Sequence, residues 1–138
     1  MKILLDSNAY SLWKRGQAHV AELIRSSGEV LMPIVVVGEL LYGFRYGSRG
    51  EDNVRELHLF LGNSRVDVVA TTMTTADRYA RIASALRAKG RPIPTNDIWI
   101  AAHAMETGAD LVSSDQHFAV VDGLAWIPIR RVGSSIGD

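Results

Sequence analysis

Four acidic side chains lie next to apolar stretches of the sequence, where a carboxylate is costly unless it is paired. They are Asp6, Glu39, Asp97 and Asp115. Clustered carboxylates repel one another, so their pKa values rise unless a cation joins them. The chain has no cysteine and no paired-histidine spacing, so acidic oxygens suit Mg²⁺ or Mn²⁺ better than zinc. Such an ion can activate water and offset charge on a phosphoryl group, which indicates metal-assisted phosphodiester hydrolysis.

Asp6 and Asp115 are expected at the carboxyl ends of two strands. The apolar run 2–5 predicts a buried strand that ends at Asp6, and a strand at 111–112 ends shortly before Asp115. Ligands gather at the carboxyl ends of strands in open α/β sheets. The plainer alternative is that each aspartate only caps the helix that follows it.

The run 94–104 predicts a buried helix, with Thr95 or Asn96 as its N-cap. Asp97 then lies at the mouth of this helix, on its core-facing stripe. The apolar residues at i+3, i+4 and i+7 from it are Ile100, Ala101 and Ala104. Taken alone, Asp97 would be explained as a first-turn acid that complements the helix dipole.

Glu39 is the least expected of the four acids. Its neighbours at helical spacing are Val35, Val36, Tyr42 and Gly43. This pattern predicts a carboxylate that faces the core, where an unpaired charge is strongly destabilising. The alternative is a half-buried glutamate paired with an arginine.

The remaining pattern predicts one α/β domain over residues 1–131, with a mostly parallel central sheet of about five short strands and helices on both faces. The predicted strands are 2–5, 29–32, 66–70, 111–112 and 126–129, and the helices are 9–15, 18–26, 33–44, 52–61, 74–89 and 95–108. Pro128 cannot donate to a ladder, so the last strand should lie at an edge. Residues 132–138 are rich in Gly and Ser and are predicted to form a frayed tail.

The composition indicates a soluble globular protein, 47% hydrophobic and 22% charged. Lys plus Arg and Asp plus Glu both number 15, so nothing favours strong nonspecific nucleic-acid binding. No apolar run approaches the roughly 18 residues of a membrane span, and the N-terminus has no signal-peptide pattern. With no cysteine for disulfides, we expect a cytoplasmic protein without membrane association.

Four segments occur in a fixed order along the chain. They are Leu4-Leu5-Asp6-Ser7-Asn8, Gly38-Glu39-Leu40-Leu41-Tyr42-Gly43, Asn96-Asp97-Ile98-Trp99-Ile100-Ala101-Ala102-His103-Ala104 and Leu111-Val112-Ser113-Ser114-Asp115-Gln116-His117-Phe118. Together they resemble the signature blocks of PIN-domain ribonucleases, in particular the VapC-type toxins of toxin–antitoxin pairs. Each block alone is weak, but their order and spacing match over nearly the whole chain.

The resemblance implies roles for particular residues. The four acids would be the quartet that binds Mg²⁺ or Mn²⁺. Ser113 stands where the family usually has threonine, and its hydroxyl would help to hold the site. Asn8 would orient Asp6 or a metal-bound water, and Asn96, which commonly precedes the third acid in the family, would be a supporting group behind the metal ligands. The implied reaction is endonucleolytic cleavage of RNA by a metal-activated water, leaving a 5′-phosphate and a 3′-hydroxyl.

The resemblance also implies a cognate VapB-type antitoxin whose segment lies in an apolar groove and blocks the site. Leu12 and Trp13 are candidate groove residues, although Trp13 could simply pack in the core. Family members commonly form homodimers and hetero-oligomers with the antitoxin. Four basic residues could touch RNA phosphates or only form a solvated face: Lys14, Arg15, Arg45 and Arg49.

Two other functions fit part of the sequence. One is a structure-specific DNA or RNA processing nuclease of the same fold, and the other is a non-catalytic Mg²⁺-binding interaction domain. A receiver-type domain needs an acidic pair after the first strand, but only Asp6 stands there. His103 is predicted to be structural because it points away from Asp97 on the helix. The other three histidines show no metal-ligand spacing: His19, His58 and His117.

Overall fold

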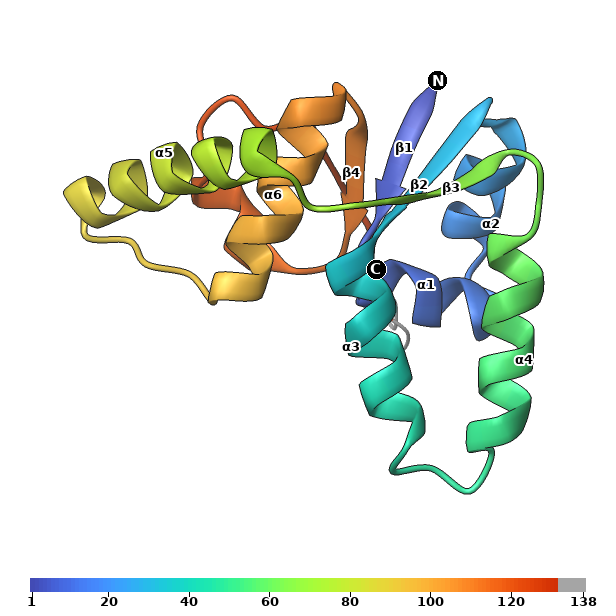
Figure 1. The fold of residues 1–138 in the computed structure, drawn as a ribbon. Coiled ribbons are helices and arrows are strands. Elements are labelled where there is room, and N and C mark those ends of the chain that lie inside the picture. The colour runs from blue at the N-terminus through green and yellow to red at the C-terminus, as the bar shows by residue number, and fades with distance from the viewer. Residues whose placement is uncertain (132–138) are drawn as a thin grey trace, which may run out of the picture.

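The computed structural model of this chain describes residues 1–131 and contains, within that range, five strands, six α-helices and one short 3₁₀ helix (Figure 1). The strands are β1 (Lys2–Leu5), β2 (Glu29–Pro33), β3 (Val66–Val69), β4 (Asp110–Ser113) and β5 (Trp126–Pro128). The helices are α1 (Ser7–Lys14), α2 (Ala18–Ser26), α3 (Ile34–Phe44), α4 (Gly50–Leu61), α5 (Met73–Lys89), α6 (Thr95–Thr107) and the 3₁₀ helix η1 (Gln116–Val120).

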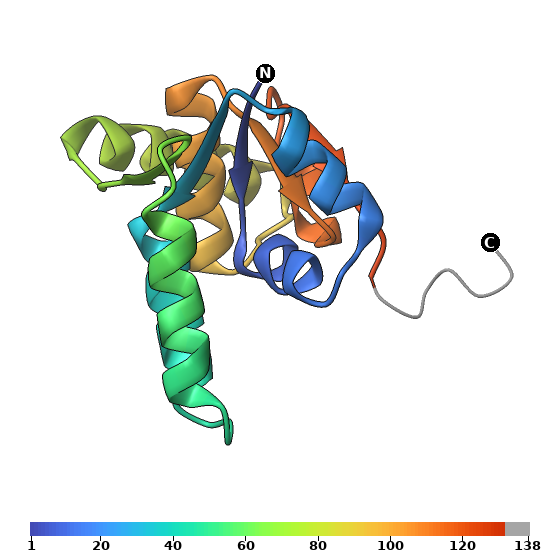
Figure 2. The ribbon, with the colours of Figure 1, turned by 90° about the vertical axis from the view of Figure 1, so that its right-hand side faces the viewer.

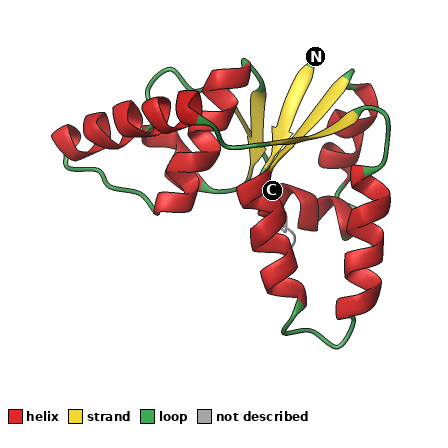
Figure 3. Ribbon diagram, in the orientation of Figure 1, coloured by secondary structure: helices red, strands yellow, loops and turns green. Residues whose placement is uncertain are grey.

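The five strands form one sheet in the order β3-β2-β1-β4-β5, and every neighbouring pair is parallel. Helices α5 and α6 lie on one side of the sheet, and α1 and α2 lie on the other (Figures 1 and 3). The expected α/β fold with about five parallel strands is therefore confirmed. β5 lies at one edge of the sheet, as the proline in the last strand predicts.

The strand order changes direction between β1 and β4. The chain first builds outward from β1 through β2 to β3, then crosses back through α5 and α6 to place β4 on the other side of β1. This is a topological switch point, where open α/β sheets bind their ligands. The register pairs Leu5 with Val112, so the residues that follow β1 and β4 emerge side by side.

The core explains why β1 is an unbroken apolar run. Ile3, Leu4 and Leu5 are all fully buried, because helices cover both faces of the central strand. Edge strand β3 differs, since Asp67 and Val68 are exposed there. Hairpin α3–α4 extends beyond the carboxyl edge of the sheet and gives the molecule its long arm (Figure 2).

Helix α6 begins at Thr95, as predicted, but its N-cap residue is Pro94 and not Thr95 or Asn96. Pro94 has φ −55° and ψ 145° and provides no side-chain cap. The Pro94 carbonyl accepts hydrogen bonds from the backbone N–H groups of Asp97 and Ile98, so Thr95 already belongs to the helix. A proline is suitable at this boundary because its fixed φ leads into the first turn.

The described residues leave two of the sequence predictions untested. The predicted frayed tail, 132–138, lies outside the described residues. The domain boundary at residue 131 stays a prediction. No helix in the described range, 1–131, is long and apolar enough to cross a membrane.

Candidate active site

Asp6 and Ser113 meet across the switch point. Asp6 follows β1, is 3% exposed, and acts as the N-cap of α1 by accepting the Ala9 N–H at 2.8 Å. Its second oxygen accepts a short hydrogen bond from the hydroxyl of Ser113, a fully buried residue that ends β4. The hydroxyl in turn accepts the backbone N–H of Asp115 at 2.9 Å. The serine therefore connects the first and fourth acids of the sequence.

The environment of Asp6 disfavours its charged form. Burial raises the pKa of the carboxyl to about 7, and the hydrogen bonds from Ser113 and Ala9 offset only part of this effect. The charges of Asp115 and Asp97 raise the pKa further. A cation near Asp6 would reverse this effect, because it would stabilise the carboxylate at neutral pH.

Asp97 and Asp115 are joined by His117. Asp97 lies in the first turn of α6, and Asp115 is the N-cap residue of η1. His117 Nδ1 lies 2.9 Å from Asp97 Oδ2 and 3.0 Å from Asp115 Oδ1. Burial raises the pKa of Asp97, and the hydrogen bond from His117 lowers it by a smaller amount. The same hydrogen bond is the main cause of a raised pKa at His117.

Glu39 completes the group from the side of α3. Its Oε2 accepts a hydrogen bond of 3.1 Å from Asn96 Nδ2, on the turn that carries Asp97. Its Oε1 is buried and has no hydrogen-bond partner among the described residues. The charge of Glu39 also raises the pKa of Asp97. A buried carboxylate oxygen without a partner is costly, and a bound cation would satisfy it.

The side chain of Glu39 is less buried than the sequence predicts. The core face of α3 is formed by Val36, Val37 and Leu40, whereas Tyr42 is 64% exposed. Glu39 lies at the border of this face and is half-buried. Its polar partner is Asn96, not the arginine of the alternative interpretation.

The structure thus places Asp6, Glu39, Asp97 and Asp115 on the side of the sheet where the carboxyl ends of the strands lie. They come from four separate parts of the chain. Asp6 and Asp115 also cap α1 and η1, as the plainer interpretation predicts, and this capping leaves room for a shared site. Their catalytic and metal-binding roles stay predictions. Asn8 lies in the first turn of α1, where its side chain is exposed and makes no hydrogen bond to the described residues.

Sequence reasoning missed His117. The sequence predicts no metal-ligand spacing for His117, whereas the structure places its ring against Asp115, two residues earlier. The Asp115 carboxylate accepts the His117 backbone N–H at 2.9 Å, which turns the chain and brings the imidazole next to the acid. An Asp-x-His sequence after a strand was the available signal.

Several other candidates from the sequence have structural partners. Leu12 is buried in the core, and Trp13 packs against Phe60 of α4 at 4.8 Å between ring centroids. Lys14 pairs with Glu56 at 2.8 Å, and Arg49 lies 3.8 Å from the same glutamate. Acids of α4 thus offset two of the four basic residues considered for RNA.

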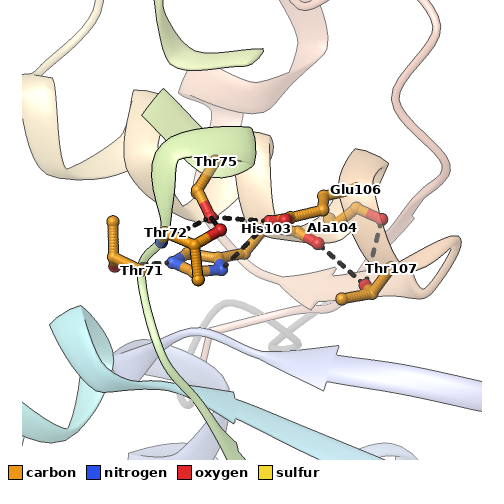
Figure 4. Close-up of polar contacts among 7 residues, drawn as sticks. All are labelled: Thr71, Thr72, Thr75, His103, Ala104, Glu106 and Thr107. Carbon is orange, nitrogen blue, oxygen red and sulfur yellow. Dashed lines mark hydrogen bonds and ion pairs between the residues drawn. The ribbon is translucent and has the colours of Figure 1, made fainter. Parts of the chain in front are cut away.

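His103 has a structural environment away from the acids, as the sequence predicts. It is fully buried, and its Nε2 lies 3.0 Å from the Thr71 hydroxyl on the segment before α5 (Figure 4). Thr75 donates to Glu106 at 2.7 Å beside it, and His103 Nδ1 has no hydrogen-bond partner among the described residues. This network fastens α5 to α6.

The stability of the protein is expected to decrease as pH is lowered because of His103. Burial lowers the pKa of this imidazole, and Glu106, 3.9 Å from Nδ1, offsets part of that effect. The unfolded chain takes up a proton near its ordinary pKa, whereas the folded chain does so only at lower pH. The stabilisation is therefore full above the unfolded pKa and is lost as pH falls through the folded pKa.

Urea unfolding of wild type and His103→Gln, in EDTA at about pH 5 and about pH 7.5, tests this effect. Between about pH 5 and about pH 7.5, the free energy of unfolding should increase by a larger amount in wild type than in His103→Gln. The exposed His19, replaced in the same way, is the control and should leave the difference unchanged. Equal pH dependence in wild type and His103→Gln would contradict the assignment.

A family comparison decides the identity of the fold. The sequence model of the PIN-domain family matches residues 3–124, which is most of the chain. The chain belongs to the PIN-domain family. This PIN domain is 30% identical over 132 residues to Ribonuclease VapC1 of Haemophilus influenzae strain R2866, covering 91% of this chain and 96% of the relative. The resemblance to VapC proteins is therefore confirmed.

Solved structures of VapBC complexes contain the same fold. VapBC2 from Rickettsia felis, bound to a DNA fragment from their promoter, matches this PIN domain with a TM-score of 0.81 and 26% identity, over 94% of this chain and 100% of that one. VapBC-1 from nontypeable Haemophilus influenzae matches with a TM-score of 0.81 and 28% identity, over 93% and 98%. The agreement covers nearly the whole domain.

Proposed function

We propose that this PIN domain is a metal-dependent endoribonuclease of the toxin kind, held inactive by a cognate antitoxin. One observation carries the proposal: four carboxylates from separate elements lie near the switch point, with the pKa of Asp6 raised to about 7, Glu39 Oε1 buried without a partner among the described residues, and ligand atoms of Asp97 and Asp115 within 4.8 Å of each other. Such a group is strained by its own charge unless a cation joins it. The name of the relative, Ribonuclease VapC1, supports RNA as the substrate.

In this proposal, Asp6, Glu39, Asp97 and Asp115 hold Mg²⁺ or Mn²⁺. The ion would lower the pKa of an attacking water and offset charge on the scissile phosphate. Ser113 fixes the orientation of Asp6 through its hydroxyl, and Asn96 fixes Glu39 through its amide. Asn8, exposed beside Asp6, keeps an amide available for a water or for the substrate.

A protein partner is supported by the matching structures, which are toxin–antitoxin complexes. A groove of about 1000 Å³ lies between α3 and α4 and is lined by apolar and basic side chains together with the acids Glu51 and Asp52. Its lining includes Leu41, Phe44, Val54, Arg45, Arg49 and Arg55. We propose that an antitoxin segment binds along this arm and that the PIN domain forms homodimers in the complex. The apolar groove of the sequence prediction then lies at α3–α4 and not at Leu12.

Cleavage of a mixed RNA pool by the purified protein tests the proposal, in Mg²⁺ or Mn²⁺ against EDTA. We expect metal-dependent cutting by wild type that Asp115→Asn lacks, with 5′-phosphate ends on the products. Branched and single-stranded DNA in parallel reactions tests the alternative processing nuclease. Cutting of DNA but not RNA would favour that alternative, and metal binding with no cutting of any substrate would favour the non-catalytic interaction domain.

A further inference from the structure

His117 occupies a distinctive position between two of the acids. Its Nδ1 faces Asp97 Oδ2 at 2.9 Å and Asp115 Oδ1 at 3.0 Å, so one ring nitrogen contacts both carboxylates. The three donor atoms belong to a group in which all lie within 4.8 Å of one another. The ring is half exposed, which leaves it accessible to an ion from solvent.

The position of the ring is fixed by its neighbours. The His117 backbone N–H donates to Asp115 Oδ1 at 2.9 Å, and Phe118, the next residue, is 1% exposed in the core. The backbone that carries the imidazole is therefore held on both sides of the ring, and the two carboxylates contact the ring itself. A pre-positioned side chain loses little conformational entropy when it binds a ligand.

The spacing of the donor atoms matches a metal site. In an octahedral site with bonds of about 2.1 Å, adjacent ligand atoms are about 3.0 Å apart. The distances from His117 Nδ1 to the two carboxylate oxygens agree with this edge length. A second observation is the unpartnered oxygen of a neighbouring acid: Glu39, whose charge raises the pKa of Asp97, has a buried Oε1 without a partner among the described residues.

We propose that His117 is a nitrogen ligand of the metal in this site and makes the site prefer transition-metal ions to Mg²⁺. This inference rests on the proposed function to the extent that the acids hold a divalent cation. Imidazole nitrogen adds little to the binding of Mg²⁺, which prefers oxygen ligands, but it strengthens the binding of Co²⁺ and Ni²⁺. Without His117, the site would consist of oxygen ligands alone.

Calorimetric titration of the whole chain with Ni²⁺, Co²⁺ and Mg²⁺, each added as the metal alone, tests the proposal. We expect His117→Ala and His117→Asn to weaken Ni²⁺ and Co²⁺ binding by roughly tenfold or more and Mg²⁺ binding by less than about threefold. The visible absorption band of bound Co²⁺ should shift when the nitrogen ligand is lost. His19→Ala, at an exposed histidine outside the site, should match wild type.

Two results would overturn the role of His117. Equal weakening of Mg²⁺ and Ni²⁺ would show that the histidine only positions Asp97 and Asp115, and unchanged affinities would show that it does not contact the ion. Asp97→Asn separates this test from the proposed function. If that variant binds all three ions as tightly as wild type, the assignment of the metal site to these acids is wrong. If it loses binding while His117→Ala keeps the wild-type ratio of Mg²⁺ to Ni²⁺ affinity, only the ligand assignment is refuted.

Discussion

Replacing Asp6 with asparagine is expected to stabilise the metal-free protein at about pH 8 while abolishing RNA cleavage. The pKa of this buried carboxyl is raised from 3.8 to about 7, mainly by burial. Its contribution to stability is full below the unfolded pKa and is lost as pH rises through the folded pKa. Above about pH 7 the folded protein carries a buried charge that destabilises it by up to roughly 4 kcal/mol, and a neutral amide removes this effect.

The expected gain in free energy of unfolding is about 2 kcal/mol or more. It is smaller than the full cost of the buried charge because the new amide changes the local hydrogen bonds. The Asp6→Asn variant keeps an oxygen for the Ala9 N–H, but its new NH₂ group must donate to Ser113. Urea unfolding in EDTA at about pH 5 and about pH 8 measures the effect, which should be larger at the higher pH. Asp67→Asn, at an exposed position, should change stability by less than about 0.5 kcal/mol. A less stable Asp6→Asn at pH 8 would show that the carboxylate is already well compensated.

Replacing Asp97 with asparagine is expected to lower RNA cleavage by at least about 10³-fold without unfolding the protein. Loss of a metal ligand removes several kcal/mol of transition-state stabilisation, and each 1.36 kcal/mol corresponds to about a tenfold change in rate. Asp97 lies in the first turn of α6, and the asparagine side chain has nearly the same volume as the aspartate side chain. Circular dichroism and the free energy of unfolding should therefore stay close to wild type.

Single-turnover cleavage and Mn²⁺ titration of the same Asp97→Asn preparation provide the measurement. Asp77→Asn is the matched control, because Asp77 pairs with Arg81 on the exposed surface of α5, where an ion pair contributes little. The control should cleave RNA and bind Mn²⁺ as wild type does. Turnover at the wild-type rate in Asp97→Asn would remove this residue from the proposed site.

The strand-end acids show what a sequence can predict. Asp6 and Asp115 follow short apolar runs, and parallel strands place their carboxyl ends at one edge, so a shared site follows from local pattern and general topology. The prediction needs no knowledge of which strands are neighbours. The sheet order, with β1 beside β4, then brings the two acids into contact through Ser113.

Glu39 and His117 show where local pattern is insufficient. The helical neighbours of Glu39 include the aromatic residue Tyr42. Its side chain is exposed because α3 extends beyond the sheet. Apolarity alone does not reveal where a helix leaves the core. His117 contacts Asp97 across a separation of 20 residues, and that contact depends on how η1 packs beside α6. The interaction is tertiary, so spacing along the chain does not encode it.

The same distinction applies to His103. Its direction on the helix, away from Asp97, could be predicted from helical geometry. Its partner, Thr71, lies 32 residues earlier on a segment without regular structure. The sequence therefore predicts that the histidine is structural but not what holds it.

The bond between Ser113 and Asp6 spans 107 residues of chain, from the first strand to the fourth. Asp6 is synthesised before Ser113 and Asp115, so a growing chain that has not yet reached β4 cannot assemble the site. Pairings of such long range also form late in folding. On the proposed function, cleavage can therefore begin only after β4 has been made and has paired with β1.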